Sequence, residues 1–373
     1  MKHTPREPDN SFRMKRVPAS WPIAPPRIVF VGEAPGETEA RKGVPFVGAA
    51  GNVLNDLLRM ANIKRSECMI TNVFQVHPPN NDLDFFFIKP QKIKENGLES
   101  VYFGKGSPFF SGHGYLRTEW VAELERLKQE LIKAQPRVIV ALGALALWAL
   151  TGHHEIGKYR GYALESTLVP GVRVIPTYHP AYIIRKYDWF PISGADLIKV
   201  RAAAESESKL CPDRQVWIEP TISDLLEFER VHLQDVELLS VDIETDYKRT
   251  KLIECIGFAP NPYISLVIPF IDRRKPGWNY WNTAAREVRA WEWVKRILED
   301  PTVPKLGQGF LYDVSWLDFK MGIKVRGIIE DTMILHHSLQ PEMQKSLNFL
   351  GSVYTNERAW KQRVDFSAHK VEA

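Results

Sequence analysis

The chain has 373 residues, of which 44% are hydrophobic and 25% are charged. This length exceeds that of one typical domain, and the composition is that of an ordinary globular protein, which excludes the disordered and fibrous classes. The formal net charge of +4 is compatible with a polyanionic partner without demanding one.

Cysteine usage and hydropathy exclude further classes. Cys68, Cys211 and Cys255 lie far apart and form no CxxC pair, so neither a disulfide framework nor a zinc motif is present. No apolar run approaches the roughly 20 residues that span a bilayer, and the segment MKHTPREPDN at the start lacks a signal peptide's apolar stretch. We expect a cytoplasmic protein, of a bacterium or a phage-infected host, with no membrane partner.

After an N-terminal extension (1–26), strand-like and helical patterns alternate over residues 27–203, which predicts a parallel sheet covered by helices. The strand-like runs are RIVFVG, CMITNVF, RVIVALG and VRVIPTYHP. Residues 82–117 are rich in glycine and aromatic residues without a clear period, and we interpret them as an inserted loop region.

Residues 204–235 lose apolar periodicity, and we place the linker between two domains there. A second α/β unit follows over residues 236–373. Its first half reads as a strand meander, VELLSVDIET, CIGFA and YISLVIPF, and its later part alternates helices with the strand PKLGQGF.

The segment VGEAPGETEARKGVPFVGAAG joins the first strand to a helix and is unusually rich in glycine. Its glycines let the main chain approach a ligand closely, at the strand ends where open α/β sheets bind ligands. Glu33 suits the positioning or deprotonation of a water molecule, and Phe46 suits stacking on a flat ligand. The glycines are Gly32, Gly36, Gly43, Gly48 and Gly51.

Two further strands end in polar residues. Asn72 closes CMITN with a side chain that offers both a donor and an acceptor, which suits the edge of a pyrimidine. His179 closes VRVIPTYH and can donate a hydrogen bond to a carbonyl oxygen that gains negative charge.

Residues 27–203 resemble family-four uracil-DNA glycosylases in the motifs GEAPG, GVPFVG, TNV followed by PPNN, RVIVALG and HPAYIIR. The resemblance implies an α/β/α sandwich that flips uracil out of DNA and hydrolyses its N-glycosidic bond. Phe46 would stack on uracil, Asn72 would read its edge, His179 would stabilise the departing uracil anion, and Glu33 would place the water. The expected substrate contacts also include Gly32, Ala34, Pro35, Gly36 and Arg185, with Arg41 and Lys42 as further candidates for phosphate contacts.

Two departures from that family bear on function. Ala34 stands where the most active branch of the superfamily carries an aspartate, so we expect modest turnover. The family holds an iron-sulfur cluster on four cysteines, whereas the N-terminal segment here has none and the two later positions correspond to Val76 and Glu123. Because a cluster needs thiolate ligands, we predict that the glycosylase domain has no cluster and no other cofactor.

In the second unit, LLSVDIETD places Asp242 and Glu244 two residues apart on one face of a strand. Paired carboxylates suit a divalent cation, Mg²⁺ or Mn²⁺. With PKLGQGFLYDVSWL and EDTM, residues 236–355 resemble the 3′-5′ exonuclease domain of family A DNA polymerases, a ribonuclease H-like fold with a mixed sheet. The resemblance implies that Asp313 is a third metal ligand.

This second resemblance is incomplete. Gly309 replaces the family's usual asparagine, and no tyrosine precedes Asp365 at the spacing of the third exonuclease motif. We therefore expect an incomplete metal site. Such a site would be found in the N-terminal part of a phage-type polymerase that is cut or split before the third motif. Polymerase or replication proteins are the expected partners beside uracil-containing DNA. Two alternatives stay open: a non-catalytic module that tethers DNA, and a split polymerase whose main activity is the exonuclease.

Overall fold

The computed structural model describes residues 15–103, 106–206, 213–246 and 251–357. The chain divides into two compact units, residues 1–210 with 351–373 and residues 211–350. Within the described ranges, no helix has the length and apolar character that a membrane crossing requires.

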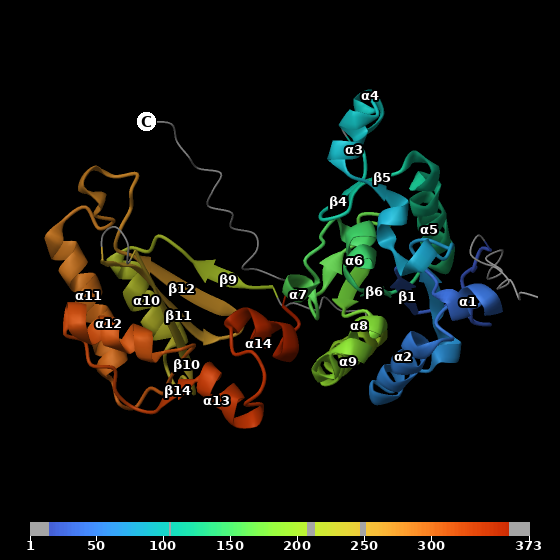
Figure 1. Cartoon of the computed structure of the whole chain (residues 1–373). Coiled ribbons are helices and arrows are strands. Elements are labelled where there is room, and N and C mark those ends of the chain that lie inside the picture. The colour runs from blue at the N-terminus through green and yellow to red at the C-terminus, as the bar shows by residue number, and fades with distance from the viewer. Residues whose placement is uncertain (1–14, 104–105, 207–212, 247–250, 358–373) are drawn as a thin grey trace, which may run out of the picture. The chain divides into compact units, whose positions relative to one another are not determined.

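The first unit is built on a five-stranded sheet of order β2-β1-β6-β8-β7 (Figure 1). Its first four strands in that order pair in parallel, as the sequence predicts, and β7 adds an antiparallel edge that the sequence did not reveal. The strands are β1 (Ile28–Gly32), β2 (Met69–Asn72), β6 (Val138–Leu142), β7 (Leu164–Glu165) and β8 (Arg173–Thr177).

Helices cover both faces of this sheet, because alternate residues of each strand point to opposite sides. Val29 and Val31 of β1 belong to the same buried cluster as residues of α5 and α6. Ile28 and Phe30 belong to the opposite cluster, with residues of α2, α8 and α9. The α/β/α sandwich is therefore confirmed. The helices are α1 (Glu37–Lys42), α2 (Ala49–Met60), α5 (Val121–Ala134), α6 (Ala144–Thr151), α7 (Ile156–Tyr159), α8 (Pro180–Arg185) and α9 (Phe190–Glu205).

The inserted region has regular structure of its own, which its irregular sequence did not predict. Three short strands form a separate sheet of order β3-β5-β4, and stacked aromatic rings such as Phe74 on Phe86 pack it onto the sandwich. Its elements are β3 (Phe87–Ile88), α3 (Pro90–Glu95), α4 (Glu99–Tyr102), β4 (Phe109–Phe110) and β5 (Gly114–Leu116).

The structure differs from the expected linker over 204–235. Residues 215–217 form strand β9, which pairs with β12, and residues 222–232 form helix α10. Thr221 and Asp224 make a capping box at the start of α10, a signal that the charged composition of this segment obscured.

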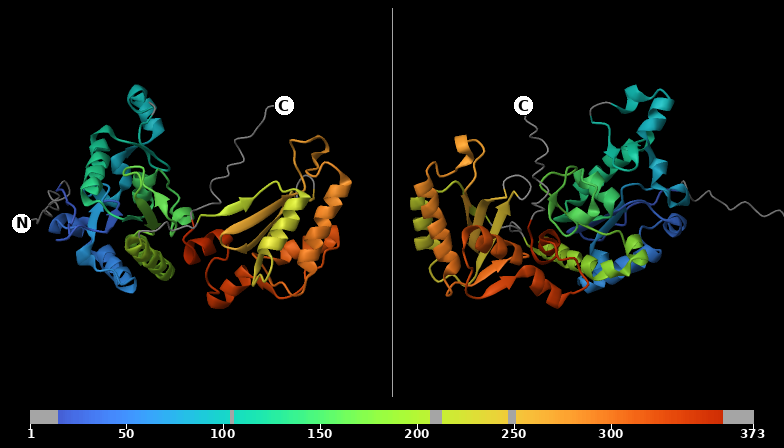
Figure 2. Two further views of the ribbon diagram at one scale, coloured as in Figure 1. Left: turned by 180° about the vertical axis from the view of Figure 1, so that it is seen from behind. Right: turned by 60° about the vertical axis from the view of Figure 1, so that its left-hand side comes forward.

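The second unit has a six-stranded sheet of order β14-β13-β10-β11-β12-β9, and the sheet is mixed, as the sequence predicts. The meander β10, β11 and β12 is antiparallel, whereas β13, β14 and β9 pair in parallel with their neighbours. Helices α10 and α11 lie side by side against one face, as Figures 1 and 2 show. The elements are β9 (Gln215–Trp217), α10 (Ile222–His232), β10 (Leu239–Thr245), β11 (Ile253–Asn261), β12 (Ile264–Pro269), α11 (Ala284–Glu299), β13 (Lys305–Gly307), α12 (Leu311–Met321), β14 (Ile329–Asp331) and α13 (Thr332–Leu339), followed by α14 (Leu347–Tyr354).

Candidate active site

The carboxyl ends of β1, β2, β6 and β8 open into a pocket of about 790 Å³ in the first unit. Most residues predicted from the sequence line it, and Gly32 does not. The lining set includes Glu33, Ala34, Pro35, Gly36, Phe46, Asn72, His179 and Arg185.

Gly32 lies directly against two residues that line the pocket, Asn72 and Phe46. A Cβ built on Gly32 would lie 2.3 Å from Asn72 Oδ1 and 2.5 Å from the tip of the Phe46 ring. The glycine therefore allows the amide of Asn72 and the ring of Phe46 to meet over the end of β1.

Phe46 is held in a left-handed backbone conformation, with φ of 53°. Its ring is 6% exposed and packs in the core beside Leu54, while it also borders the pocket. Arg65 donates hydrogen bonds of 3.0 Å to the carbonyl oxygens of both Pro45 and Phe46. The ring is thus a packing group as well as a pocket group.

Glu39 fixes the other side of this loop. Its carboxylate is buried and accepts hydrogen bonds from the backbone N–H groups of Val47 (2.9 Å) and Gly48 (2.7 Å). Sequence reasoning missed both Glu39 and Arg65, since each acts on the backbone of residues distant in sequence.

His179 is the N-cap of α8, and its Nδ1 accepts a hydrogen bond of 3.2 Å from the N–H of Ala181. A neutral ring in this arrangement carries its proton on Nε2. Nε2 is buried and has no hydrogen-bond partner within the described part of the chain. The Nε2–H group is therefore a hydrogen-bond donor available to a ligand.

Asn72 presents the complementary group. The residue is 2% exposed, and its Oδ1 is buried without a hydrogen-bond partner among the described residues. Buried polar atoms are rarely left unpaired, because the loss of water costs about 1–3 kcal/mol per group. Two such atoms, one donor and one acceptor, border the same pocket.

Glu33 lies beside His179 over the loop that follows β6. A Cβ built on Gly143 would lie 2.6 Å from Glu33 Oε1 and 3.0 Å from the Cβ of His179. Gly143 has φ of 91°, and it leaves room for the carboxylate and the imidazole at one end of the pocket. The sequence motif RVIVALG contained this glycine, but only the fold reveals its contact with both side chains.

Of the three expected phosphate contacts, only Arg185 borders the pocket, and its side chain is exposed. Arg41 forms an exposed ion pair with Glu37, and Lys42 lies at the surface. Their contacts with DNA stay predictions.

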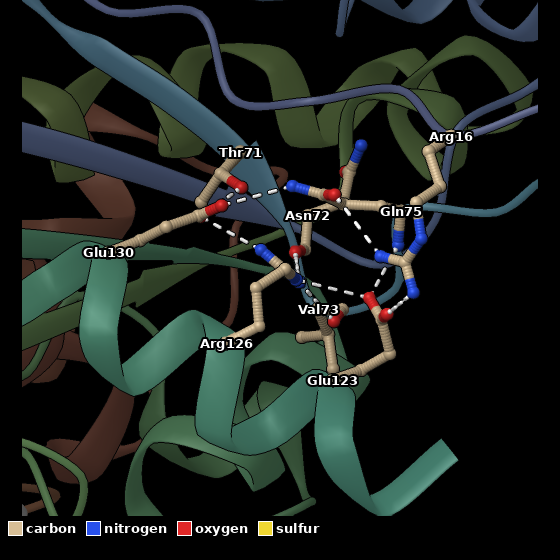
Figure 3. Close-up of polar contacts among 8 residues, drawn as sticks. All are labelled: Arg16, Thr71, Asn72, Val73, Gln75, Glu123, Arg126 and Glu130. Carbon is tan, nitrogen blue, oxygen red and sulfur yellow. Dashed lines mark hydrogen bonds and ion pairs between the residues drawn. The ribbon is translucent and has the colours of Figure 1, made fainter. Parts of the chain in front are cut away.

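The donor set does not fit a four-thiolate cluster, since the whole chain has only three cysteines. In this unit Cys68 is buried, and burial raises the pKa of its thiol to about 12, away from the thiolate that would bind iron. Val76 is buried, and Glu123 lies in a polar network with arginine partners (Figure 3).

In the second unit, Asp242 and Glu244 lie on β10 and Asp313 lies on α12. Asp313 is buried, and its Oδ1 accepts a hydrogen bond of 2.9 Å from the N–H of Ile243. Burial, and then the charges of Asp242 and Glu244, raise the pKa of Asp313 to about 6. Within the described ranges, no group of three or more His, Cys, Asp or Glu side chains is placed to hold a metal ion. Asp365 lies outside the described residues.

Asp331, in the EDTM motif, has a structural role that the sequence did not reveal. Its carboxylate accepts hydrogen bonds from the N–H groups of Gly309 (3.0 Å), Phe310 (2.7 Å) and Met333 (2.8 Å). It ties the end of β14 to the loop before α12.

Comparison with known proteins finds a matching family for each of the two units. The profile of the uracil DNA glycosylase superfamily matches residues 21–199. The type-4 uracil-DNA glycosylase of Thermotoga maritima is 37% identical over 161 residues, which cover 43% of this chain and 67% of that protein. That of Archaeoglobus fulgidus is 31% identical over 205 residues, covering 53% of this chain and 82% of that protein.

This chain belongs to the type-4 uracil-DNA glycosylase family. The glycosylase unit is followed by a domain of the 3′-5′ exonuclease type, whose profile matches residues 220–368. A solved RNase D of Trypanosoma brucei is 20% identical over a match that covers 34% of this chain and 40% of that chain, with a TM-score of 0.26.

Proposed function

We propose that the first unit takes a uracil nucleotide flipped out of DNA into this pocket and hydrolyses its N-glycosidic bond. The observation that carries the proposal is the pair of unpartnered buried atoms, Asn72 Oδ1 and His179 Nε2. Uracil has an N–H donor beside carbonyl acceptors, so one planar ligand can satisfy both atoms.

We assign one residue to each step. Phe46 offers a ring against which the base stacks, and Asn72 accepts from the uracil N–H. As the glycosidic bond breaks, negative charge moves onto the base, and the His179 Nε2–H donates to the carbonyl oxygen that gains it. Glu33 orients a water molecule toward the anomeric carbon, where an oxocarbenium-like centre develops.

The decisive test measures uracil release from a labelled single-stranded oligonucleotide in EDTA. We expect release by the intact chain, a loss on the order of 100-fold in His179→Ala, and no loss in His154→Ala, an exposed histidine of the same unit. Binding of the oligonucleotide without release by the intact chain would overturn the proposal and support the tethering module instead.

We further propose that the exonuclease-type domain uses Mg²⁺ or Mn²⁺ weakly. Asp242 and Glu244 offer two carboxylates on one strand, whereas Asp313 is engaged with the N–H of Ile243 and completes no three-ligand group among the described residues. A calorimetric titration of the full chain with Mn²⁺ should show weak, single-site binding that falls in Asp242→Asn. Tight binding of two ions per chain would overturn the incomplete-site proposal.

The joining of a glycosylase unit and an exonuclease-type domain in one chain supports action near replicating DNA, in the cytoplasm of a bacterium or an infected host. A polymerase is then the partner we propose. Retention of a family A polymerase by the immobilised chain in nuclease-treated extract would support this, and its loss after nuclease treatment would show that DNA alone joins them.

A further inference from the structure

Arg126 holds the end of strand β2 from outside the sheet. Its Nη2 donates hydrogen bonds to the carbonyl oxygens of Asn72 (2.8 Å) and Val73 (2.7 Å), as Figure 3 shows. Strand β2 is at the edge of the sheet, where Ser20 pairs with Ile70 and Val17 donates to the carbonyl oxygen of Gln75. Between these two backbone contacts, a side chain of α5 binds the carbonyl group of Asn72, the residue whose Oδ1 is unpartnered in the pocket.

Two carboxylates of α5 fix the Arg126 guanidinium in turn. Its Nε donates to Glu123 (3.1 Å), and its Nη1 forms an ion pair with Glu130 at 2.8 Å. Both partners lie one turn away on the same helix, where such pairs meet. Three hydrogen bonds and one ion pair orient the planar guanidinium, although Nη1 itself makes no hydrogen bond among the described residues. A lysine ammonium cannot reproduce this forked arrangement of donors.

The carboxylates are anchored to β2 as well. Glu123, 2% exposed, accepts from the N–H of Gln75 (3.1 Å) and pairs with Arg16 at 2.6 Å. Glu130 accepts from Thr71 (2.9 Å) and from the side-chain amide of Gln75 (3.0 Å). The network thus joins α5 to β2 on both sides of Asn72 (Figure 3).

On its other side, the same stretch is tied to the catalytic loop. Val73 donates to the carbonyl oxygen of Gly32 (2.9 Å) and Phe74 to that of Glu33 (3.0 Å). Arg126 therefore binds the same stretch of backbone that carries Asn72 and that contacts Glu33. Displacement of reacting groups by about 1 Å can cost on the order of 100-fold in rate.

We propose that Arg126 is a positioning residue for uracil recognition, acting through Asn72, and that the ionic network of Arg16, Glu123, Arg126 and Glu130 supports β2 where the family resemblance expects a cluster. This inference rests on the proposed function. Glu123 stands at one of the positions where the resemblance expects a cysteine. Its carboxylate binds Arg16, Arg126 and the N–H of Gln75.

The test is a double-mutant cycle on single-turnover uracil release, with the full chain in excess over oligonucleotide. Arg126→Lys should lower the rate on the order of 10-fold or more, with little change in affinity for a uracil-free oligonucleotide. In an Asn72→Ala background the same substitution should change the rate less than about twofold, because the group it positions is gone.

Arg117→Lys is the matched control. Arg117 likewise binds a backbone carbonyl, donating from its Nε to that of Phe87 (3.0 Å), and it makes no hydrogen bond to Asn72 within the described part of the chain. It should leave the rate unchanged. If Arg126→Lys lowers the rate by the same factor in both backgrounds, the residue is merely structural and the inference is wrong.

Amide hydrogen exchange distinguishes an error in the role of Arg126 from an error in the proposed function. Arg126→Lys should speed amide exchange in the peptide that covers residues 72–75, and Arg117→Lys should not. Unchanged exchange would overturn the role of Arg126 even if uracil is released. Absence of release by the unsubstituted chain would instead overturn the proposed function and, with it, any role of Arg126 in recognition.

Discussion

The carbonyl oxygen of Phe46 occupies the space that a side chain at Gly51 would need: a Cβ built on Gly51 lies 2.0 Å from it. The obstacle is backbone, which cannot move aside as the end of a flexible side chain can. The first turn of α2 therefore accepts only glycine while Phe46 keeps its position at the pocket.

Gly51→Ala should consequently displace the loop that carries Phe46 and lower uracil release on the order of 10- to 100-fold. Gly194→Ala is the control, because a Cβ there would meet only the flexible, half-exposed end of Met60. Release assays and thermal melting of both variants check this. Equal rates for the two variants would show that the loop tolerates the displacement.

Phe46 itself allows packing and stacking to be separated. Since Phe46 is 6% exposed and lies in the core, Phe46→Ala should destabilise the unit by roughly 3–5 kcal/mol. Phe46→Leu keeps much of the apolar volume and should cost less than about 1.5 kcal/mol. Both variants lose the aromatic face, worth about 1–3 kcal/mol per stacked base, so both should release uracil slowly. Full activity in Phe46→Leu would exclude a stacking role.

The strand ends that form the pocket could be predicted from sequence because each follows a short apolar run in a βα pattern. Glu33, Asn72 and His179 were found in this way, and the fold brings them to one pocket. Glu39, Arg65 and Arg126 were not found, because they bind backbone groups 9, 19 and 54 residues away and carry no motif of their own.

The inserted sheet and β9 were missed for a different reason. Strands of two or three residues, such as β3 and β4, are too short to show a period of two. Their positions depend on tertiary contacts, such as the stacking of Phe74 on Phe86, that local sequence does not encode.

Asn72 should be a residue whose removal costs activity but little stability. Its Oδ1 is buried and unpartnered among the described residues, so Asn72→Ala removes a desolvation cost of about 1–3 kcal/mol while it leaves a small cavity. We expect an unfolding free energy within about 1 kcal/mol of the original and a large drop in uracil release. Denaturant unfolding beside the release assay checks this, and a stability loss above about 2 kcal/mol would show that the amide is satisfied in the free protein.

Asp313 gives the second unit a pH-dependent stability. Its folded-state pKa is raised to about 6, first by burial and then by Asp242 and Glu244. The folded chain therefore keeps a proton that the unfolded chain loses near its ordinary pKa of about 3.9. As pH rises from about 4 to about 6, stability falls, and the full cost, at most about 3 kcal/mol, is present above pH 6.

In EDTA, Asp313→Asn should therefore raise the melting temperature of the second unit more at pH 8 than at pH 5. The asparagine oxygen still accepts from the N–H of Ile243, so the buried hydrogen bond is kept. Asp318→Asn, at an exposed position on the same helix, should change the melting temperature little at either pH. Differential scanning calorimetry of the full chain measures this directly. If the gain in melting temperature is equal at both pH values, the Asp313 carboxyl does not titrate in this range. Burial and the charges of Asp242 and Glu244 then do not keep that carboxyl protonated in the metal-free chain.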